Sequence, residues 1–216
     1  MISKLHYITQ GNTTKEHIEN IQNACASGIE WIQLRLKGLG EKEILETALK
    51  AREITSHYQT RLIVNDYYKI AKEVKADGVH LGKTDTDPTK AKAFLYSWQT
   101  IGGTANTLED CERLISKKID YIGLGPYKFT ATKKNLSPIL GIEGYKALVD
   151  ELKTEIPIIA IGGITLNDVE EIMNTGVYGI AVSGEITKNF NNISAFNTIL
   201  KTSSANEQIF KLGKQE

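Results

Sequence analysis

Short apolar segments alternate along the chain with longer segments in which apolar residues recur at helical spacing. The short segments are rich in β-branched residues and are bounded by glycine and polar residues, as strands covered on both faces are. They span residues 5–9, 29–36, 61–65, 78–81, 100–105, 121–125, 156–161 and 179–183. The pattern therefore predicts eight buried strands, each followed by a helix.

The helices are predicted from apolar spacing and from the residues at their ends. Their expected ranges are 13–27, 40–57, 67–75, 108–116, 142–153, 166–174 and about 193–200, with one more that begins after Asp87. Gly28 and Gly176 end two of them, and Thr107 caps a third. Pro88 suits the first position of the helix after Asp87.

Eight strand–helix units without a break in composition predict an α/β fold, a single (β/α)8 TIM barrel over residues 1–202. The alternative is a doubly wound open sheet, which does not need eight similar units. Residues 203–216 are polar and lack a clear apolar face. We expect them to form a mobile tail or a frayed helix.

Opposite charges balance in this chain, since Lys and Arg total 26 and Asp and Glu total 26. Because a neutral protein lacks the electrostatic footprint of a nucleic-acid or membrane-surface binder, we expect neither partner. The N-terminal residues show no basic leader and no membrane-length apolar run, which predicts a cytoplasmic protein. Cys25 and Cys111 lack metal-site or redox spacing and are expected to be buried thiols. The sequence leaves a homodimer open.

Polar residues alternate with apolar ones in the second predicted strand. The alternation turns the apolar side chains of residues 32–36 toward the helices, and Gln33, Arg35 and Lys37 toward the barrel interior. Buried cations need a bound anion or a carboxylate to compensate them. The alternative is a solvated edge strand, which a closed barrel does not contain.

Two carboxylates follow neighbouring strands, Asp66 after residues 61–65 and Asp85 after residues 78–81. Functional groups of such barrels collect at these strand ends, and Mg²⁺ commonly takes one or two carboxylates with waters and substrate phosphates. Each carboxylate could instead cap a helix, as could Asp87. Facing Arg35 and Lys37, the pair suggests a site for a metal-bound diphosphate.

A second anion site is predicted at the last two strands. Gly162 and Gly163 follow the seventh strand and open the backbone to close approach, and Thr165 can cap the next helix. Ser183 follows the eighth strand, completing the phosphate cradle that many barrels carry. The alternative is a tight turn that needs glycine for its dihedral angles alone.

A long loop follows the sixth strand and contains the hydroxyls of Thr130 and Thr132 with Lys133 and Lys134. Such a loop can close over an anionic ligand, although it can also be an ordinary solvated loop. Thr104, at the end of the fifth strand, is a further candidate for a phosphate contact. His80 lies within a strand and is expected to be a hydrogen-bonded core residue. Together the residues predict displacement of diphosphate, with no strand-end cysteine or histidine as nucleophile or base.

At this point the chain resembles the thiamine-phosphate synthase family over about residues 5–200. The matching motifs are Gln33-Leu-Arg-Leu-Lys37, Asn65-Asp66, Gly78-Val-His-Leu-Gly82 with Asp85, Gly125-Pro126 with Thr130-Ala-Thr-Lys133, Ala160-Ile-Gly-Gly-Ile164 and Val182-Ser183. The resemblance implies a transferase of thiamine biosynthesis. Such an enzyme couples hydroxymethylpyrimidine diphosphate with thiazole phosphate in the presence of Mg²⁺ and releases thiamine phosphate and diphosphate.

The resemblance also implies roles for individual residues. Arg35, Lys37 and Lys133 would be catalytic, and Asp66 and Asp85 would bind Mg²⁺. The substrate-binding residues would be Gln33, Leu34, Arg35, Leu36, Lys37, Asn65, Thr104, Thr130, Ala131, Thr132, Lys133, Gly163, Val182 and Ser183.

Two positions depart from the family pattern, which usually has Gln at Lys83 and Ser at Thr104. Threonine keeps the hydroxyl, whereas Lys83 adds a charge beside the proposed metal pair. The alternatives are a thiazole tautomerase, whose members carry histidine where this chain has Pro126, and a barrel that binds thiazole or thiamine phosphate as a regulator without turnover.

Overall fold

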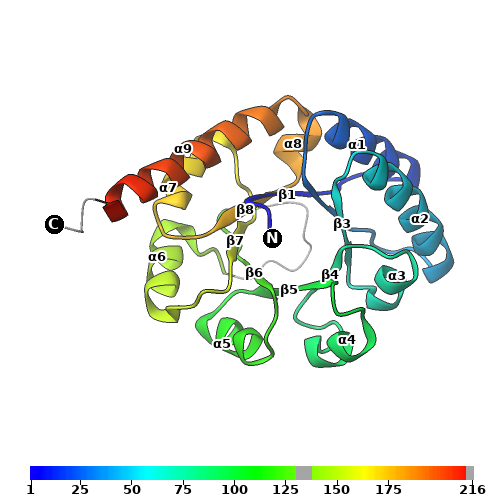
Figure 1. Cartoon of the computed structure of the whole chain (residues 1–216), viewed down its shortest axis with the longest axis horizontal. Helices are drawn as coiled ribbons and strands as arrows, with labels where there is room; N and C mark the ends of the chain where they lie inside the picture. Colours follow the sequence, from blue (N-terminus) through cyan, green and yellow to red (C-terminus); the bar gives the residue numbers. More distant parts are fainter. Residues whose placement is uncertain (130–137, 213–216) are drawn as a thin grey trace.

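The computed structural model describes residues 1–129 and 138–212, and its strands form one closed barrel (Figure 1). The strands are β1 (Leu5–Ile8), β2 (Trp31–Leu34), β3 (Arg61–Asn65), β4 (Gly78–Leu81), β5 (Thr100–Ala105), β6 (Tyr121–Leu124), β7 (Ile158–Ile161) and β8 (Gly179–Val182). Each pairs in parallel with its neighbour in sequence, and β1 pairs with β8, Leu5 beside Ile180. The predicted TIM barrel is confirmed, and the open sheet is excluded.

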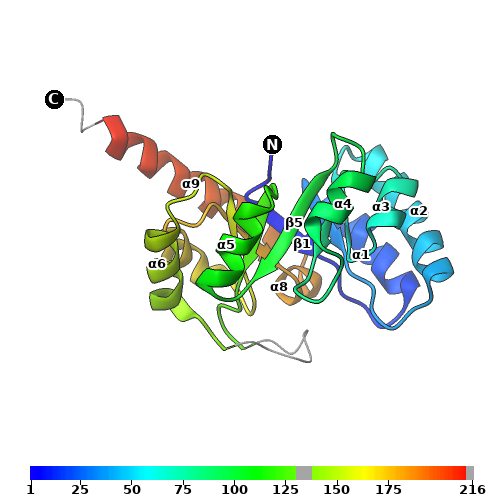
Figure 2. The ribbon, with the colours of Figure 1, turned by 90° about the horizontal axis from the view of Figure 1, so that it is seen from below.

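Helices surround this barrel (Figures 1 and 2). They are α1 (Thr14–Ala26), α2 (Glu41–His57), α3 (Tyr68–Glu73), α4 (Pro88–Phe94), α5 (Leu108–Ser116), α6 (Gly141–Leu152), the 3₁₀ turn η1 (Leu166–Asp168), α7 (Val169–Met173), α8 (Gly184–Lys188) and α9 (Asn192–Leu212). The expected boundary residues act as predicted. The Thr107 side chain accepts a hydrogen bond from the Asp110 amide, and Pro88 begins α4 after its cap Asp87.

The elements depart from the sequence prediction in several places. Strand β2 ends at Leu34, so Arg35 and Lys37 lie in the loop that follows it. The short helix α8 was not predicted, because five residues carry too little periodicity to be recognised. Helix α9 continues to Leu212 instead of ending near Leu200. No glycine or proline interrupts that segment before Gly213, so nothing in its sequence stops the helix.

The core has two layers. The outer layer lies between strands and helices and includes Ile32, Leu34 and Leu36, as the alternation in the second strand predicted. The inner layer fills the barrel with the side chains of Ile8, Trp31, Ile63, Tyr121, Ile159 and Ala181. Cys25 and Cys111 are buried free thiols, as predicted.

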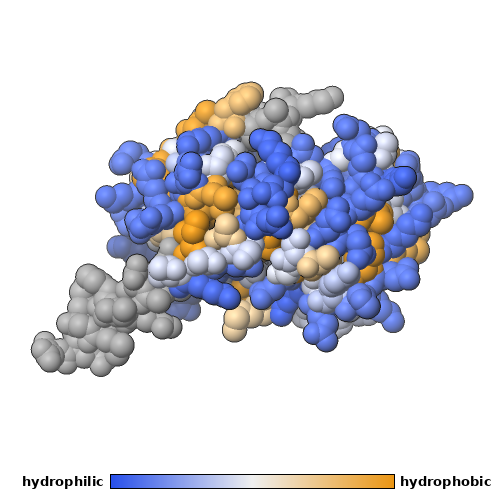
Figure 3. All heavy atoms as spheres, turned by 90° about the horizontal axis from the view of Figure 1, so that it is seen from above, coloured by the Kyte–Doolittle hydropathy of each residue, from blue (hydrophilic) through white to orange (hydrophobic). Residues whose placement is uncertain are grey.

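The surface is mostly hydrophilic on the face drawn in Figure 3, where hydrophobic residues form small separate areas. Within the described ranges, no helix is long and apolar enough to cross a membrane.

Candidate active site

Asp66 and Asp85 meet at the ends of β3 and β4. Asp66 has a left-handed backbone with φ of 66°, and its amide donates to the His80 carbonyl at 2.8 Å. Asp85 closes a turn in which the Gly82 amide donates to its Oδ2 at 2.7 Å. A Cβ placed on Gly82 would lie 2.6 Å from that Oδ2 and 4.0 Å from Asp66 Oδ1. The two carboxylates therefore converge over Gly82, which has to be free of a side chain.

Helix capping explains only the third aspartate of this region. Asp87 caps α4 by accepting from the Thr89 amide at 2.8 Å. The helix after Asp66 begins with Tyr67 as its cap and has no side-chain capping bond. The capping alternative is thus right for Asp87, whereas the carboxylates of Asp66 and Asp85 face each other.

The electrostatics of the pair are those of two acids that compete for one proton. Burial, together with the adjacent Asp85, raises the pKa of Asp66 to about 6. Burial acts to raise the pKa of Asp85 too, but hydrogen bonds from Asp66 and the Gly82 amide bring it below its ordinary value. A neighbouring cation relieves such repulsion, and Lys37 Nζ contacts Asp66 Oδ2.

Gln33 in β2 and Lys37 in the loop after β2 lie at different depths in the barrel. Gln33 is buried inside the barrel, whereas the Lys37 side chain is 53% exposed at the rim. The expectation that Lys37 lies in the barrel interior is therefore wrong, because the strand ends three residues before it. Arg35 lies between Gln33 and Lys37. Its amide donates to Thr9 Oγ1 at 3.0 Å, and this hydrogen bond fixes the backbone there.

His80 links the barrel interior to the mouth of the barrel, which is the end where the C-terminal ends of the strands open. Its Nδ1 lies 3.0 Å from Tyr121 Oη, and its Nε2 lies 2.9 Å from Thr104 Oγ1. It is buried and hydrogen-bonded, as predicted for a core residue. Sequence reasoning did not foresee that it would contact Thr104, a candidate substrate-binding hydroxyl. No signal in the sequence gives this contact, because it depends on the strand register, which pairs His80 with Gly102, two residues before Thr104.

The glycine turn after β7 packs against the loop that follows β6. Gly162 and Gly163 have φ of 105° and 67°, and a Cβ on Gly163 would lie 2.7 Å from the Phe129 carbonyl oxygen. The Lys128 amide donates to the Gly162 carbonyl at 2.9 Å. Turn geometry and this close approach thus account for both glycines without a ligand.

The start of the helix after this turn is firmly held. Thr165 and Asp168 form a capping box, which confirms the cap predicted at Thr165. Lys128 Nζ lies 2.5 Å from Asp168 Oδ1 and joins the loop to the same cap. Gly163, just before this cap, is exposed at the mouth of the barrel.

The other predicted site residues divide into two groups. Asn65 and Val182 are buried at the ends of β3 and β8, and Ser183 is partly exposed, with Oγ 3.4 Å from Gln10 Oε1. Thr130, Ala131, Thr132 and Lys133 lie outside the described residues.

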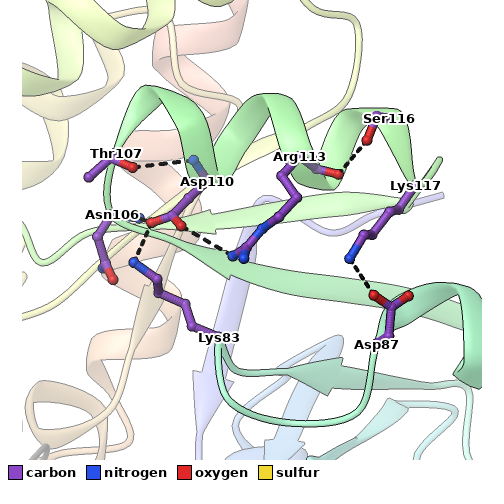
Figure 4. A network of polar contacts seen from close by, with 8 residues as sticks. All are labelled: Lys83, Asp87, Asn106, Thr107, Asp110, Arg113, Ser116 and Lys117. Atoms are coloured by element: carbon purple, nitrogen blue, oxygen red, sulfur yellow. Dashed lines mark hydrogen bonds and ion pairs between the residues drawn. The ribbon is translucent and has the colours of Figure 1, made fainter.

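Lys83 does not contact the carboxylate pair. Its ammonium lies 2.6 Å from Asp110 Oδ2 on α5, as Figure 4 shows. The charge that departs from the family pattern is therefore already paired.

The carboxylate pair suits Mg²⁺. Among the described residues, no group of three or more His, Cys, Asp and Glu side chains is arranged to hold a metal ion. Mg²⁺ does not need one, because it commonly binds through one or two carboxylates and keeps several waters. Asp66 and Asp85 fit that requirement. Their carboxylates converge at the mouth, and the pKa of Asp66 is raised whereas that of Asp85 is lowered.

Comparison with known proteins adds independent observations. A family model described as thiamine monophosphate synthase matches residues 5–186. A thiamine-phosphate synthase of Flavobacterium psychrophilum is 45% identical over 194 residues, which cover 88% of this chain and 94% of that protein. One of Bacteroides thetaiotaomicron is 42% identical over 187 residues, covering 85% and 90%. The solved thiamine phosphate pyrophosphorylase from Pyrococcus furiosus superposes with a TM-score of 0.79 at 30% identity, over 93% of this chain and 96% of that one.

Proposed function

This chain belongs to the thiamine monophosphate synthase family and is a transferase of thiamine biosynthesis; we propose that it couples hydroxymethylpyrimidine diphosphate with thiazole phosphate, with Mg²⁺, at the mouth of this barrel. The products are thiamine phosphate and diphosphate. The observation that carries the proposal is the convergence of Asp66 and Asp85 beside Lys37. It supplies a cation site and a positive side chain at one place.

The diphosphate substrate occupies the β2–β4 side of the mouth in this proposal. Asp66 and Asp85 would hold Mg²⁺, which when bound would supply charge stabilisation for the departing diphosphate. Arg35 and Lys37 neutralise its remaining oxygens, as Lys133 does from the loop outside the described residues. Gln33, Asn65 and Thr104 line the place of the pyrimidine diphosphate. Leu34 and Leu36 contribute backbone groups only, because their side chains pack in the outer layer of the core.

The structure explains the orientation of the Thr104 hydroxyl. His80 hydrogen-bonds to its Oγ1 and is itself fixed by Tyr121, so the Thr104 hydroxyl has a set direction at the strand end. A fixed polar group stabilises a developing charge better than a mobile one, because it needs no reorganisation.

The thiazole phosphate occupies the β7–β8 side. Gly163, Val182 and Ser183 contribute backbone and hydroxyl groups for its phosphate, together with Thr130, Ala131 and Thr132. The rigid Thr165–Asp168 cap keeps the Gly163 turn in place. The two anion sites therefore hold the substrates from opposite sides of the mouth, and the reacting atoms meet between them.

The reaction asks for little acid–base chemistry from the protein. In the family mechanism, diphosphate leaves before the thiazole nitrogen attacks the pyrimidine methylene carbon. His80, the histidine nearest the carboxylate pair in sequence, is buried and bonded to Tyr121 and Thr104. Its place supports a role in orientation and not in proton transfer.

The alternatives are less well supported. A thiazole tautomerase carries histidine at the position of Pro126 and has no use for the Asp66–Asp85 pair. A regulator without turnover was suggested only by Lys83, whose charge is paired with Asp110. We further propose a cytoplasmic location and small phosphorylated substrates as the partners.

The proposal is tested by incubating the purified chain with both substrates and Mg²⁺, with and without a chelator, and by measuring thiamine phosphate and diphosphate. We expect both products in equal amounts, and none with the chelator until Mg²⁺ is restored. Binding of thiazole phosphate without product formation would contradict a synthase and favour the regulator.

A further inference from the structure

Two ion pairs fasten the loop between β4 and α4 to helix α5, one on each side of Asp85 (Figure 4). Lys83 Nζ lies 2.6 Å from Asp110 Oδ2, and Lys117 contacts Asp87. The loop is thus held at residues 83 and 87, and the candidate metal ligand lies between the two attachment points.

Asp110 is a rigid anchor for the first of these ion pairs. Its side chain is 9% exposed, and its Oδ2 also accepts from the Asn106 amide at 3.1 Å. Its own amide donates to Thr107, and Arg113 lies 3.2 Å from its other oxygen. These contacts orient the carboxylate at the first turn of α5, and Lys83 is paired with it in that orientation.

The position of Lys83 in the chain couples it to Asp85. Lys83 is the second residue of the turn in which the Asp85 amide donates to the Gly82 carbonyl at 3.2 Å and the Gly82 amide donates to Asp85 Oδ2 at 2.7 Å. A shift of Lys83 therefore moves both the peptide that orients the Asp85 carboxylate and the carboxylate itself.

The packing of this loop against α5 leaves open space. A cavity of about 130 Å³ lies between the loop and α5, lined by residues that include Lys83, Asp85 and Arg113. The Asp85 carboxylate also converges with that of Asp66 over Gly82, and two carboxylates this close repel each other when both are charged. Without an attachment, the loop has both the space and an electrostatic reason to move Asp85 away from Asp66.

We propose that Lys83 is a positioning residue for Mg²⁺: through its ion pair with Asp110 it holds the Gly82–Asp85 turn so that the Asp85 carboxylate stays against Asp66. The inference rests on the proposed function, because it takes these two carboxylates as the metal ligands. It assigns Lys83 a task that the uncharged residue usual at this position cannot perform in the same way.

The test measures metal binding apart from turnover. Mn²⁺ is titrated by electron paramagnetic resonance into the full-length chain with inorganic diphosphate and without the pyrimidine substrate. We expect Lys83→Met to raise the Mn²⁺ dissociation constant about tenfold, the usual effect of losing a group that orients a metal ligand. Lys83→Arg keeps the ion pair and should stay within about twofold of the parent chain.

Two further variants complete the design. Asp110→Asn should weaken Mn²⁺ binding as Lys83→Met does, and the double variant should be no weaker than either single one. Lys15→Met is the matched control, because it removes an exposed Lys–Glu pair on α1, far from the mouth in the sequence. In turnover assays, Lys83→Met should raise the KM for the pyrimidine diphosphate and leave the KM for thiazole phosphate unchanged.

Two different failures can be told apart. If Lys83→Met binds Mn²⁺ as tightly as Lys15→Met does, the positioning role of Lys83 is overturned, whatever the melting temperatures of the two variants. The metal site itself would still stand. Mn²⁺ affinity that survives Asp66→Asn would overturn the metal site itself and this inference with it.

Discussion

Asp66 combines an unusual backbone with an unusual charge. Its φ of 66° lies in the left-handed region, which costs energy for most residues but which Asp and Asn tolerate. Such strain tends to persist where a side chain has to be presented in one direction. Here the backbone directs the carboxylate toward Asp85 and Lys37.

Asp66→Asn separates charge from backbone conformation, since Asn adopts the same φ. We expect product formation to fall by about 100-fold or more, because one of the two proposed metal ligands loses its charge. The free energy of unfolding near neutral pH should stay the same or rise by about 1 kcal/mol, since the raised pKa of Asp66 means that the fold disfavours its charged form. Turnover assays and urea titrations check this, and a large loss of stability would contradict it.

Sequence reasoning at the residue scale identified the charged groups well and their surroundings less well. The Asp66–Asp85–Lys37 cluster follows from strand ends, because parallel strands of a barrel open on one side. The exposure of Lys37 and the contact between His80 and Thr104 do not follow, because they depend on where a strand stops and on how neighbouring strands are staggered.

At the scale of elements, the two loops after β6 and β7 form one unit. The Tyr127 amide donates to the Ile161 carbonyl at 2.8 Å, and the Lys128 amide donates to the Gly162 carbonyl at 2.9 Å. The Lys128–Asp168 contact extends this unit to the helix cap. The glycines were predicted for a phosphate, but within the described residues they serve first to let one loop approach the other.

Gly162→Ala should therefore destabilise the fold. Its φ of 105° is strained for alanine, and the added Cβ would lie 2.7 Å from Pro126 Cβ. We expect a loss of about 2 kcal/mol or more in the free energy of unfolding, measured by urea titration. Gly184→Ala is the control, because its Cβ would meet nothing closer than 3.5 Å, and it should stay within about 0.5 kcal/mol. Equal effects would refute the close-approach argument.

Most element boundaries were predictable because local chemistry sets them. Asp87, Pro88 and Thr107 begin helices in the structure as in the sequence prediction. The last helix was expected to end near Leu200, with residues 203–216 as a mobile tail or a frayed helix, because that segment lacks a clear apolar face. Helix α9 reaches Leu212, which agrees with the helical alternative for the described part of the segment. Its inner part is secured by the buried side chains of Ile193, Phe196 and Leu200.

At the scale of the whole molecule, the barrel interior links stability to pH. His6 lies inside it, stacked on Trp31 at 4.5 Å between ring centroids, and its Nε2 lies 2.9 Å from the Ser3 carbonyl oxygen. Burial is the main cause that lowers its pKa from 6.5 to about 3, against the bond to Ser3. The fold thus holds a neutral imidazole where an unfolded chain would bind a proton.

Acidification should weaken the fold through His6. Between pH 6.5 and about 3 the unfolded chain binds a proton that the native protein does not, so stability falls as pH decreases, by up to about 1.4 kcal/mol per pH unit from this group. His6→Phe keeps the ring against Trp31 and should lose this part of the slope. Urea titrations at several pH values compare the two, and identical slopes would disprove it.

The pairing of β1 with β8 makes the first and last strands neighbours, although the end of β1 at Ile8 and the start of β8 at Gly179 are 171 positions apart in the sequence. In synthesis from the N-terminus, β8 emerges after the other seven strands. Until then β1 has an open edge, and the partial barrel lacks Val182 and the Ser183 that follows it. The side of the mouth to which we assign these two residues is consequently the last to be completed, so a chain terminated before β8 would contain both carboxylates without the strand that closes the barrel around them.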